Sequence, residues 1–353
     1  MKVYRLWLLI FYLIWIPAIC FGQNIRKIDN PLFVFNNSFN KRGLDTIPVM
    51  EQAALLKQWG YDGMEQRETT GLLDAIGIMK KYELRIYTDY MNVDIDKDEP
   101  YLSSWKEIIP QLKGTDLILW IHFHSKKYKP SDQMADGKIV DIVRELADYA
   151  KPYGVRLAIY HHIDFLVETA EDSYRIATKV NRENVGSVLN LCHFLKTASE
   201  DDLIRTLDLT LPKLFVVSIN GADSGDTKKM GWSQLIQPLG QGSFDCYRFV
   251  ETLIDKGYTG PIGIQCYNLK GDPGSYLLAT IKTWNDFKQR YETPLNKLST
   301  VEKTEGWKLL FDGESTKKWR GINSSDFPKS GWRIADHQLI ADLKGGGEST
   351  DAG

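Results

Sequence analysis

Histidines cluster at the ends of three apolar segments of this 353-residue chain, which contains six histidines in all. Five of the six lie at such ends, namely His122, His124, His161, His162 and His193. Imidazole exchanges a proton near neutral pH, so this residue type suits general acid–base catalysis. His162 and His193 stand where an apolar segment gives way to a loop. We therefore predict that these two are catalytic, with Glu65 and His122 assisting.

Neutral polar residues end other apolar segments in the same way, and such groups demand hydrogen-bond partners wherever they are buried. We predict substrate-binding roles for six residues: Asn37, His124, His161, Asn190, Asn220 and Gln265. The alternative for His124 and His161 is a hydrogen-bonded place in the core, because neighbours along a strand point to opposite faces. Tyr87, Trp120 and Tyr160 are interpreted as packing residues, although aromatic faces also stack on sugar rings.

Eight short apolar runs alternate with longer segments of helical periodicity. The runs are rich in Val, Ile, Leu, Phe and Tyr, as expected of strands that are covered on both faces. They span residues 31–37, 61–66, 84–90, 116–124, 155–162, 185–193, 214–220 and 261–267. This alternation predicts an α/β fold, a (βα)8 TIM barrel, whose reactive groups lie at the C-terminal ends of the strands. The alternative, a doubly wound open sheet, would carry a glycine-rich phosphate-binding turn where this chain has NNSFNKRG.

Composition and charge exclude several classes of function. Charged residues make up 25% of the chain and hydrophobic residues 43%, which is typical of a folded globular protein. The 44 Lys and Arg residues are balanced by 46 Asp and Glu residues, so the chain has no long-range attraction to nucleic acid or to an anionic membrane. Four cysteines without paired C-x-x-C spacing exclude a zinc ribbon and a disulfide-rich scaffold.

The first 22 residues have the pattern of an export signal. Lys2 and Arg5 precede an apolar run that is short for a membrane-spanning helix, and small residues lie near its end. We expect cleavage after Gly22, a periplasmic or extracellular location and no stable membrane insertion, with a retained anchor as the alternative. The barrel is then expected over residues 24–291, a polar linker over 292–304 and a β-rich segment over 305–353.

Four segments resemble the sugar phosphate isomerase/epimerase, or xylose isomerase-like, barrel family. They read GYDGMEQ (60–66), GVRLAIYHH (154–162), VGSVLNLCHFLK (185–196) and GYTGPIGIQCY (257–267). The resemblance covers residues 31–291 and implies a divalent metal held by Glu, Asp, His and Glu at four strand ends. In that family the metal polarises a substrate carbonyl while a base moves a proton.

This chain departs from the family pattern at the ligand positions. Tyr160, followed by His161, stands where the fifth strand should offer Glu, and Asn190 replaces the Asp of the sixth. Residues 218–220 (Ser-Ile-Asn) stand where a His is expected, and Gln265 replaces the last Glu. Because a hard dication is held chiefly by charged oxygens, we expect no metal and no other cofactor.

The alternative is a softer divalent ion, manganese or zinc, on three of the histidines: His161, His162 and His193.

Residues 306–347 resemble the beginning of a 3-keto-disaccharide hydrolase domain, which is a concanavalin-like β-sandwich. The resemblance lies in LFDG, a following GW and a final GGG. Because this segment is short for such a domain, we expect only its N-terminal fragment in this sequence.

Together the two resemblances imply a secreted enzyme that acts on 3-keto sugars or glycosides. A ketone at C3 acidifies the C2 proton, so a base can form an enediolate. Reprotonation then gives isomerisation or epimerisation, whereas loss of the C1 substituent cleaves the glycosidic bond. The alternative is a non-catalytic sugar-binding barrel that supports the fused domain. The expected partners are a small sugar or glycoside and, as in related barrels, a second copy in a homodimer.

Overall fold

The computed structural model describes residues 26–41, 44–45, 47–293, 296–321, 324–335 and 337–341. The expected export signal at residues 1–22 lies outside these ranges, as does the glycine run at 345–347. None of the helices within the ranges combines the length and the apolar character needed to cross a membrane.

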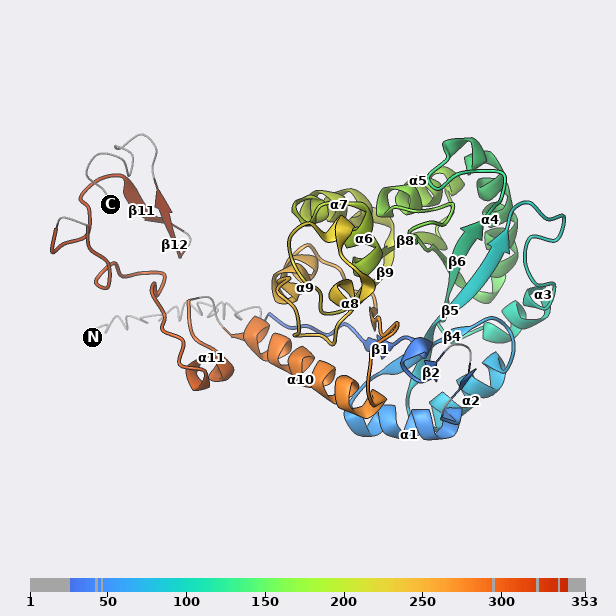
Figure 1. Cartoon of the computed structure of the whole chain (residues 1–353), viewed down its shortest axis with the longest axis horizontal. Coiled ribbons are helices and arrows are strands. Elements are labelled where there is room, and N and C mark those ends of the chain that lie inside the picture. Colours follow the sequence, from blue (N-terminus) through green and yellow to red (C-terminus); the bar gives the residue numbers. More distant parts are fainter. Residues whose placement is uncertain are drawn as a thin grey trace, which may run out of the picture.

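Eight parallel strands close into a barrel, as predicted, and each coincides with one of the eight predicted runs (Figure 1). They are β1 (Leu32–Val34), β4 (Gly63–Arg67), β5 (Arg85–Asp94), β6 (Ile118–His124), β7 (Arg156–Ile159), β8 (Val185–Asn190), β9 (Leu214–Ile219) and β10 (Ile262–Ile264). β1 pairs with both β10 and β4, and this second pairing closes the ring. The doubly wound open sheet is therefore wrong.

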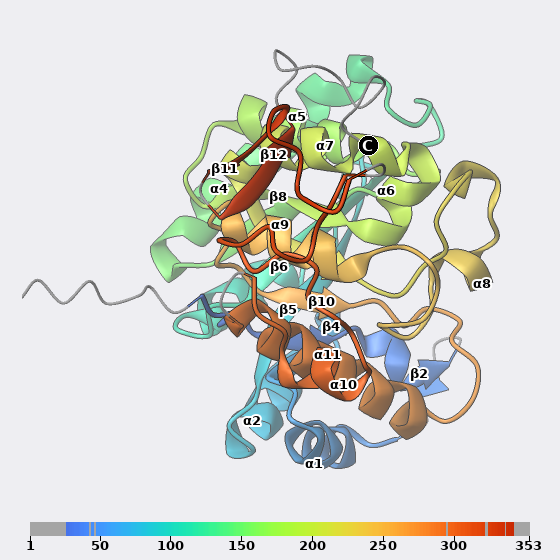
Figure 2. The same ribbon diagram turned by 90° about the vertical axis from the view of Figure 1, so that its left-hand side faces the viewer.

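Helices connect the strands and cover the outside of the barrel (Figure 2). They are α1 (Val49–Trp59), α2 (Leu72–Lys81), α3 (Trp105–Ile108), α4 (Asp136–Ala150), α5 (Ala170–Val180), α6 (Leu191–Thr197), α7 (Leu203–Thr210), α8 (Trp232–Leu235), α9 (Cys246–Asp255) and α10 (Pro273–Glu292). Two of their ends show how the sequence sets the bounds. A capping box between Thr169 and Asp172 begins α5. Gly60 ends α1 in the left-handed conformation, at φ 90°, which a residue without Cβ adopts freely.

Large aromatic side chains fill the inside of the barrel. The cluster joins Phe33, Phe35, Tyr87, Ile118, Trp120, Ala158, Tyr160, Val188 and Val216. The Trp120 and Tyr160 rings stack with their centroids 5.0 Å apart, and Phe35 meets Trp120 edge-on at 5.1 Å. The barrel interior is therefore a packed core, and its aromatic layer forms the floor beneath the strand ends.

Two hairpins and one short helix lie outside the barrel, and of these the sequence predicts only β structure near the C-terminus. Strands β2 (Asn40–Lys41) and β3 (Leu44–Asp45) pair as a short antiparallel hairpin after β1. Helix α11 (Thr300–Thr304) lies inside the predicted linker and begins with a capping box. In the C-terminal segment β11 (Trp332–Ala335) and β12 (Gln338–Ala341) form a two-stranded antiparallel sheet. The concanavalin-like assignment of that segment stays a prediction.

Candidate active site

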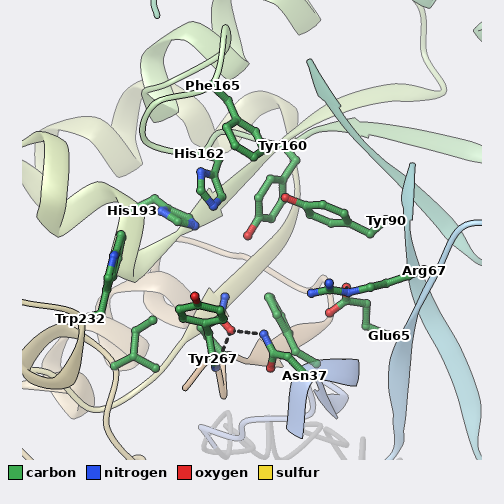
Figure 3. Close-up of a pocket in the computed structure, with 13 residues that line it drawn as sticks. Asn37, Glu65, Arg67, Tyr90, Tyr160, His162, Phe165, His193, Trp232 and Tyr267 are labelled. Carbon is green, nitrogen blue, oxygen red and sulfur yellow. Dashed lines mark hydrogen bonds and ion pairs between the residues drawn. The ribbon is translucent and has the colours of Figure 1, made fainter. Parts of the chain in front are cut away.

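A pocket of about 330 Å³, here called the strand-end pocket, opens at the C-terminal ends of the barrel strands (Figure 3). Its polar lining consists of Asn37, Glu65, Arg67, His162, His193 and Gln265. Its apolar and aromatic lining consists of Phe35, Tyr90, Tyr160, Phe165, Trp232, Ile236 and Tyr267. Active sites of this fold occupy this face of the barrel. The strand-end pocket is therefore the candidate active site.

His162 and His193 form one wall of the strand-end pocket. Their ring centroids lie 3.8 Å apart, and Phe165 stacks on His162 at 3.9 Å. His162 follows β7, and its Nδ1 lies 2.6 Å from the carbonyl oxygen of Ile163. Because a carbonyl only accepts, Nδ1 carries the proton, and Nε2 is left with a free lone pair. This tautomer suits a base.

Both histidines of this wall are held neutral by their surroundings. Burial lowers the pKa of His162. Burial and the neighbouring charges of His162 and His161 lower the pKa of His193 well below its ordinary value. At neutral pH both rings therefore hold an unprotonated nitrogen, and each can accept a proton.

Glu65 and Arg67 project from β4 on the opposite wall (Figure 3). The Glu65 side chain is 1% exposed, and its Oε1 lies 3.6 Å from Nε of the half-exposed Arg67. Burial raises the pKa of Glu65 from 4.5 to about 7, although the Arg67 charge opposes the rise. Burial, followed by the charges of Glu65 and Glu68, also raises the pKa of the neighbouring Asp89 well above its ordinary value. Glu65 is therefore a carboxyl group that exchanges a proton near neutral pH.

Two tyrosines lie between these walls. Tyr160 Oη accepts a hydrogen bond of 2.6 Å from Asn190 Nδ2, and the Tyr90 ring meets the Tyr160 ring edge-on at 5.0 Å. Burial raises the pKa of both phenols, so each keeps its proton and can donate a hydrogen bond. The guanidinium of Arg67 lies 5.5 Å from the centre of the Tyr90 ring.

Five of the ten sequence-predicted site residues line the pocket, namely Asn37, Glu65, His162, His193 and Gln265. The other five lie outside its lining. His122 is buried behind Tyr90, with the two rings stacked at 4.0 Å, and its Nδ1 lies 2.8 Å from Nε2 of His124. Asn220 donates through Nδ2 to the carbonyl oxygens of Gly221 and Leu235. Through these contacts the side chains of His122, His124 and Asn220 stabilise the strand ends and do not line the pocket.

His161 and Asn190 hold strands β7 and β8 together behind the pocket. His161 Nε2 accepts from the backbone N–H of Asn190 at 2.9 Å, so its Nδ1 carries the proton and faces the carbonyl oxygen of Glu168 at 3.3 Å. Burial lowers the pKa of His161 to about 4. Asn190 Oδ1 accepts from the backbone N–H of His193 at 3.5 Å and so begins α6. Both side chains thus support the wall formed by His162 and His193 without lining the pocket.

Replacing His161 by Phe should lower the free energy of unfolding by about 1–3 kcal/mol, because the buried N–H of Asn190 would lose its acceptor. Urea unfolding followed by circular dichroism measures the loss. The matched control is His162→Phe at the adjacent, partly exposed position, where we expect less than about 1 kcal/mol. Equal losses in the two variants would contradict the supporting role of His161.

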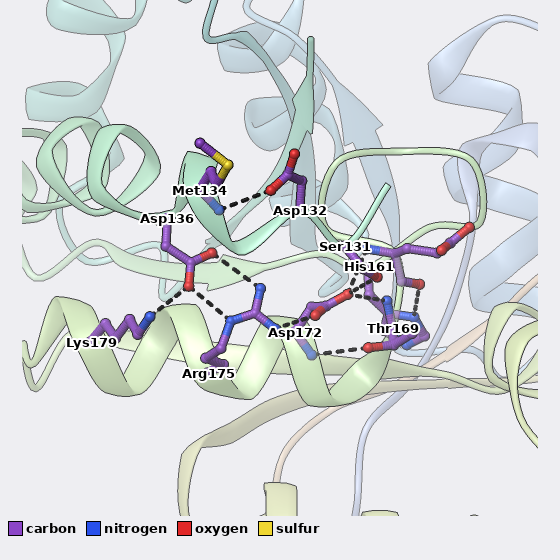
Figure 4. Close-up of polar contacts among 10 residues, drawn as sticks. Ser131, Asp132, Met134, Asp136, His161, Thr169, Asp172, Arg175 and Lys179 are labelled. Carbon is purple, nitrogen blue, oxygen red and sulfur yellow. Dashed lines mark hydrogen bonds and ion pairs between the residues drawn. The ribbon is translucent and has the colours of Figure 1, made fainter. Parts of the chain in front are cut away.

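A part-buried ionic network lies at the end of the segment that leads from β7 to α5 (Figure 4). Asp172 accepts hydrogen bonds from the Ser131 hydroxyl at 2.5 Å, from the backbone N–H of Thr169 at 3.1 Å and from Arg175. Arg175 also donates from Nε to Asp136 at 2.9 Å. Although burial acts to raise the pKa of Asp172, these bonds outweigh it and leave the pKa lowered. The network ties the β6–α4 loop to the start of α5.

The groups at the family's metal positions do not fit a divalent cation. Asn190 Oδ1 already accepts from Cys192 Sγ at 3.1 Å. Gln265 Oε1 accepts from Asn37 Nδ2 at 2.6 Å and from the backbone N–H of Tyr267 at 2.9 Å. Within the ranges that the structure describes, no group of three or more His, Cys, Asp or Glu side chains could hold a metal ion. The oxygens of Asn190 and Gln265 are neutral and already engaged, whereas a hard dication needs charged oxygens.

Several pocket residues were not predicted from the sequence. Phe165, Trp232 and Tyr267 come from loops or from a single helical turn, where no periodicity marks them. Arg67 does carry a signal, because it lies two residues after Glu65 on the same strand and therefore on the same face.

Comparison with known proteins agrees with this fold. The family model described as xylose isomerase-like TIM barrel matches residues 53–285. The inosose isomerase of Bacillus subtilis (strain 168) is 30% identical over 130 residues, which are 36% of this chain and 46% of that protein. The inosose isomerase of Halalkalibacterium halodurans is 26% identical over 168 residues, which are 47% of this chain and 57% of that protein. This chain thus spans about half the length of the curated relatives it matches.

Among solved structures, the apo form of 3-keto-D-glucoside 4-epimerase from E. coli superposes with a TM-score of 0.57. It is 15% identical and covers 73% of this chain and 99% of its own, a likeness that shows the fold alone. The matching family model covers well over half of the chain and spans every barrel strand except β1. The chain belongs to the xylose isomerase-like TIM barrel family.

Proposed function

We propose that this protein is an enzyme that moves protons next to the ketone of a cyclic keto sugar. The observation that carries the proposal is the pair of facing walls: neutral His162 and His193 on one, and Glu65 with Arg67 on the other (Figure 3). The similarity to inosose isomerases supports the same class of reaction. A 3-keto sugar or 3-keto glycoside is the substrate class that we propose.

In the proposed reaction the histidine wall removes the proton. A neutral imidazole nitrogen takes the proton from the carbon beside the ketone. The C–H electron pair forms a double bond to the carbonyl carbon, and the carbonyl π pair moves onto its oxygen to give an enediolate. The Tyr90 hydroxyl and the Arg67 guanidinium line the same pocket and supply a donor and a positive charge for the developing oxyanion.

Glu65 supplies the second proton from the opposite wall. Its pKa of about 7 leaves a substantial protonated fraction at neutral pH. Proton delivery to carbon gives the epimer or isomer, and delivery to a leaving oxygen gives glycosidic cleavage. Because the two walls face each other, we propose that removal and delivery take place on opposite faces of the sugar ring.

We further propose that this chemistry needs no divalent metal, because Arg67 lines the same pocket and supplies a positive charge there. Turnover should therefore stay within about twofold after EDTA treatment and dialysis, and added manganese or zinc should not raise it. Kinetics together with elemental analysis of the same sample measure both points. A chelator-induced loss of more than tenfold that is restored by one metal would contradict this part of the proposal.

Hydrogen exchange tests the proposed function before any product is known. The full chain is incubated in D2O with a 3-keto-glucose and, separately, with an inosose, and the loss of the C–H signal beside the ketone is followed by NMR. We expect exchange that depends on enzyme concentration. The His162→Ala/His193→Ala double variant is the matched control for spontaneous enolisation. Thermal stabilisation by these sugars without exchange would instead indicate a non-catalytic sugar-binding barrel.

A further inference from the structure

A second cavity of about 520 Å³, here called the side cavity, adjoins the strand-end pocket. Ile236 lines both cavities. In two stretches of the chain, adjacent residues line different cavities. Trp232 lines the strand-end pocket and Ser233 the side cavity. Tyr267 and Asn268 are divided in the same way. The two cavities are therefore neighbours on one face of the barrel, separated by a shared wall.

The side cavity is lined by neutral polar groups and by one charge of each sign. Its polar aliphatic side chains are Ser233, Gln237, Gln241, Asn268, Lys270, Asp272 and Ser275. Within the part of the chain that the structure describes, neither the Gln241 amide nor the Ser233 hydroxyl forms a side-chain hydrogen bond, so both are free to bind a ligand. Asp272 is already engaged as the N-cap of α10, accepting from Ser275 at 2.9 Å. Free amides and hydroxyls suit a neutral ligand rich in hydroxyl groups better than an ion.

Aromatic side chains stand at the junction of the two cavities. The Tyr267 side chain is 54% exposed. Trp232 meets the ring of His193 edge-on at 5.5 Å. Aromatic faces at the edge of a polar cavity offer flat apolar surfaces against which the C–H face of a sugar ring can pack.

From this juxtaposition we infer that the side cavity binds the second unit of a disaccharide or glycoside whose oxidised ring occupies the strand-end pocket. The inference rests on the proposed function, because it names the substrate class for the same site. Both cavity volumes fall within the range of small-molecule sites. The preferred substrate is then a 3-keto-disaccharide rather than a free keto sugar.

The test compares one long and one short substrate on three proteins. For unmodified protein, Gln241→Trp and Gln289→Trp, kcat/KM is measured with a 3-keto-disaccharide and with 3-keto-glucose. Gln241 lines the side cavity, whereas Gln289 lies exposed near the end of α10 and is the matched control. We expect the unmodified protein to favour the disaccharide at least tenfold. Gln241→Trp should lower that ratio at least tenfold by filling the cavity, and Gln289→Trp should leave it unchanged.

Binding measurements separate failure of this inference from failure of the proposed function. Calorimetric titration gives the Kd of both sugars for the three proteins, each also carrying His162→Ala and His193→Ala so that turnover contributes no heat. A Kd for the disaccharide that is no lower than that for 3-keto-glucose, or that Gln241→Trp leaves unchanged, would overturn the side-cavity assignment. Tight, Gln241-dependent disaccharide binding without exchange beside the ketone would support the cavity and overturn the proposed function alone.

Discussion

Glu65→Gln should abolish product formation while leaving hydrogen exchange beside the ketone in place. In the proposed reaction Glu65 delivers the second proton, and an amide cannot do so, which predicts a loss of about 100- to 10,000-fold in kcat. The histidine wall is intact in this variant, so removal of the first proton continues and its return from a deuterated imidazole labels the substrate. NMR in D2O follows both events in one sample. If Glu65→Gln lost hydrogen exchange as well as product formation, the assignment of proton removal to the histidine wall and proton delivery to Glu65 would be contradicted.

The same substitution should stabilise the protein at high pH. Burial raises the pKa of Glu65 from 4.5 to about 7, so the folded state holds this proton more tightly than the unfolded chain. The stabilisation from the bound proton is complete below pH 4.5 and is lost as pH rises through about 7. At about 1.4 kcal/mol for each pKa unit, Gln at this position should gain about 3 kcal/mol at pH 8 and almost nothing near pH 4.

Denaturant unfolding at the two pH values measures this difference. Glu68→Gln is the matched control, because Glu68 lies three residues away, is only partly buried and donates no proton in the proposed reaction. If the difference in unfolding free energy between Glu65→Gln and unmodified protein is the same at pH 4 and at pH 8, the buried carboxyl does not titrate in this range.

Proton delivery by Glu65 also requires its neutral form. Product formation in unmodified protein should therefore fall as pH rises through about 7.

His193→Phe should remove both exchange and product formation, by about 100-fold or more, because the histidine wall performs the first proton transfer. Phe keeps a ring of similar size beside His162, whose centroid lies 3.8 Å away, and so limits disturbance of the wall. His162→Phe should have a similar effect. The double alanine variant should be scarcely worse than either single variant, since residues that act as a unit give non-additive losses.

His124→Phe provides the control for the histidine series, because His124 is half-buried outside the pocket lining. We expect its exchange rate to stay within about threefold of unmodified protein, since no proposed step uses this ring. Melting curves and circular dichroism establish that each variant is folded, and His193→Gln gives a second, polar replacement. Exchange that survives in both His193 variants would contradict the assignment of this wall as the base.

Most of the fold could be predicted from the sequence because its signals are periodic. Eight apolar runs with helical segments between them specify a closed parallel barrel almost without alternatives. The β2–β3 hairpin and α11 were missed, because elements of two to five residues are too short to show a period. The small sheet β11–β12 agrees with a β-rich segment but is too little to define a sandwich.

The candidate site could be predicted from the sequence only to the extent that the ends of the strands could be predicted. His161 and His162 are adjacent in sequence, yet the second lines the pocket and the first supports it from behind. Which of the two faces inward depends on where β7 ends and how the chain leaves it, and the residue types do not encode that choice. A register shift between Met64 and Glu65 likewise sets how β4 lies against β5 at the strand end. Residues such as Trp232 are brought to the pocket only by the tertiary structure, so local sequence does not predict them.

The two sides of the strand-end pocket are built in different ways. The histidine wall lies beside the Asp172–Arg175–Asp136 network, whereas the boundary between the strand-end pocket and the side cavity comes from residues 232–241 and 267–272. In the proposed function, chemistry and substrate choice therefore reside in separate stretches of chain. A library confined to those two loops can therefore change which glycosides are accepted while the proton-transfer groups keep their arrangement, which makes this barrel a suitable starting point for directed evolution.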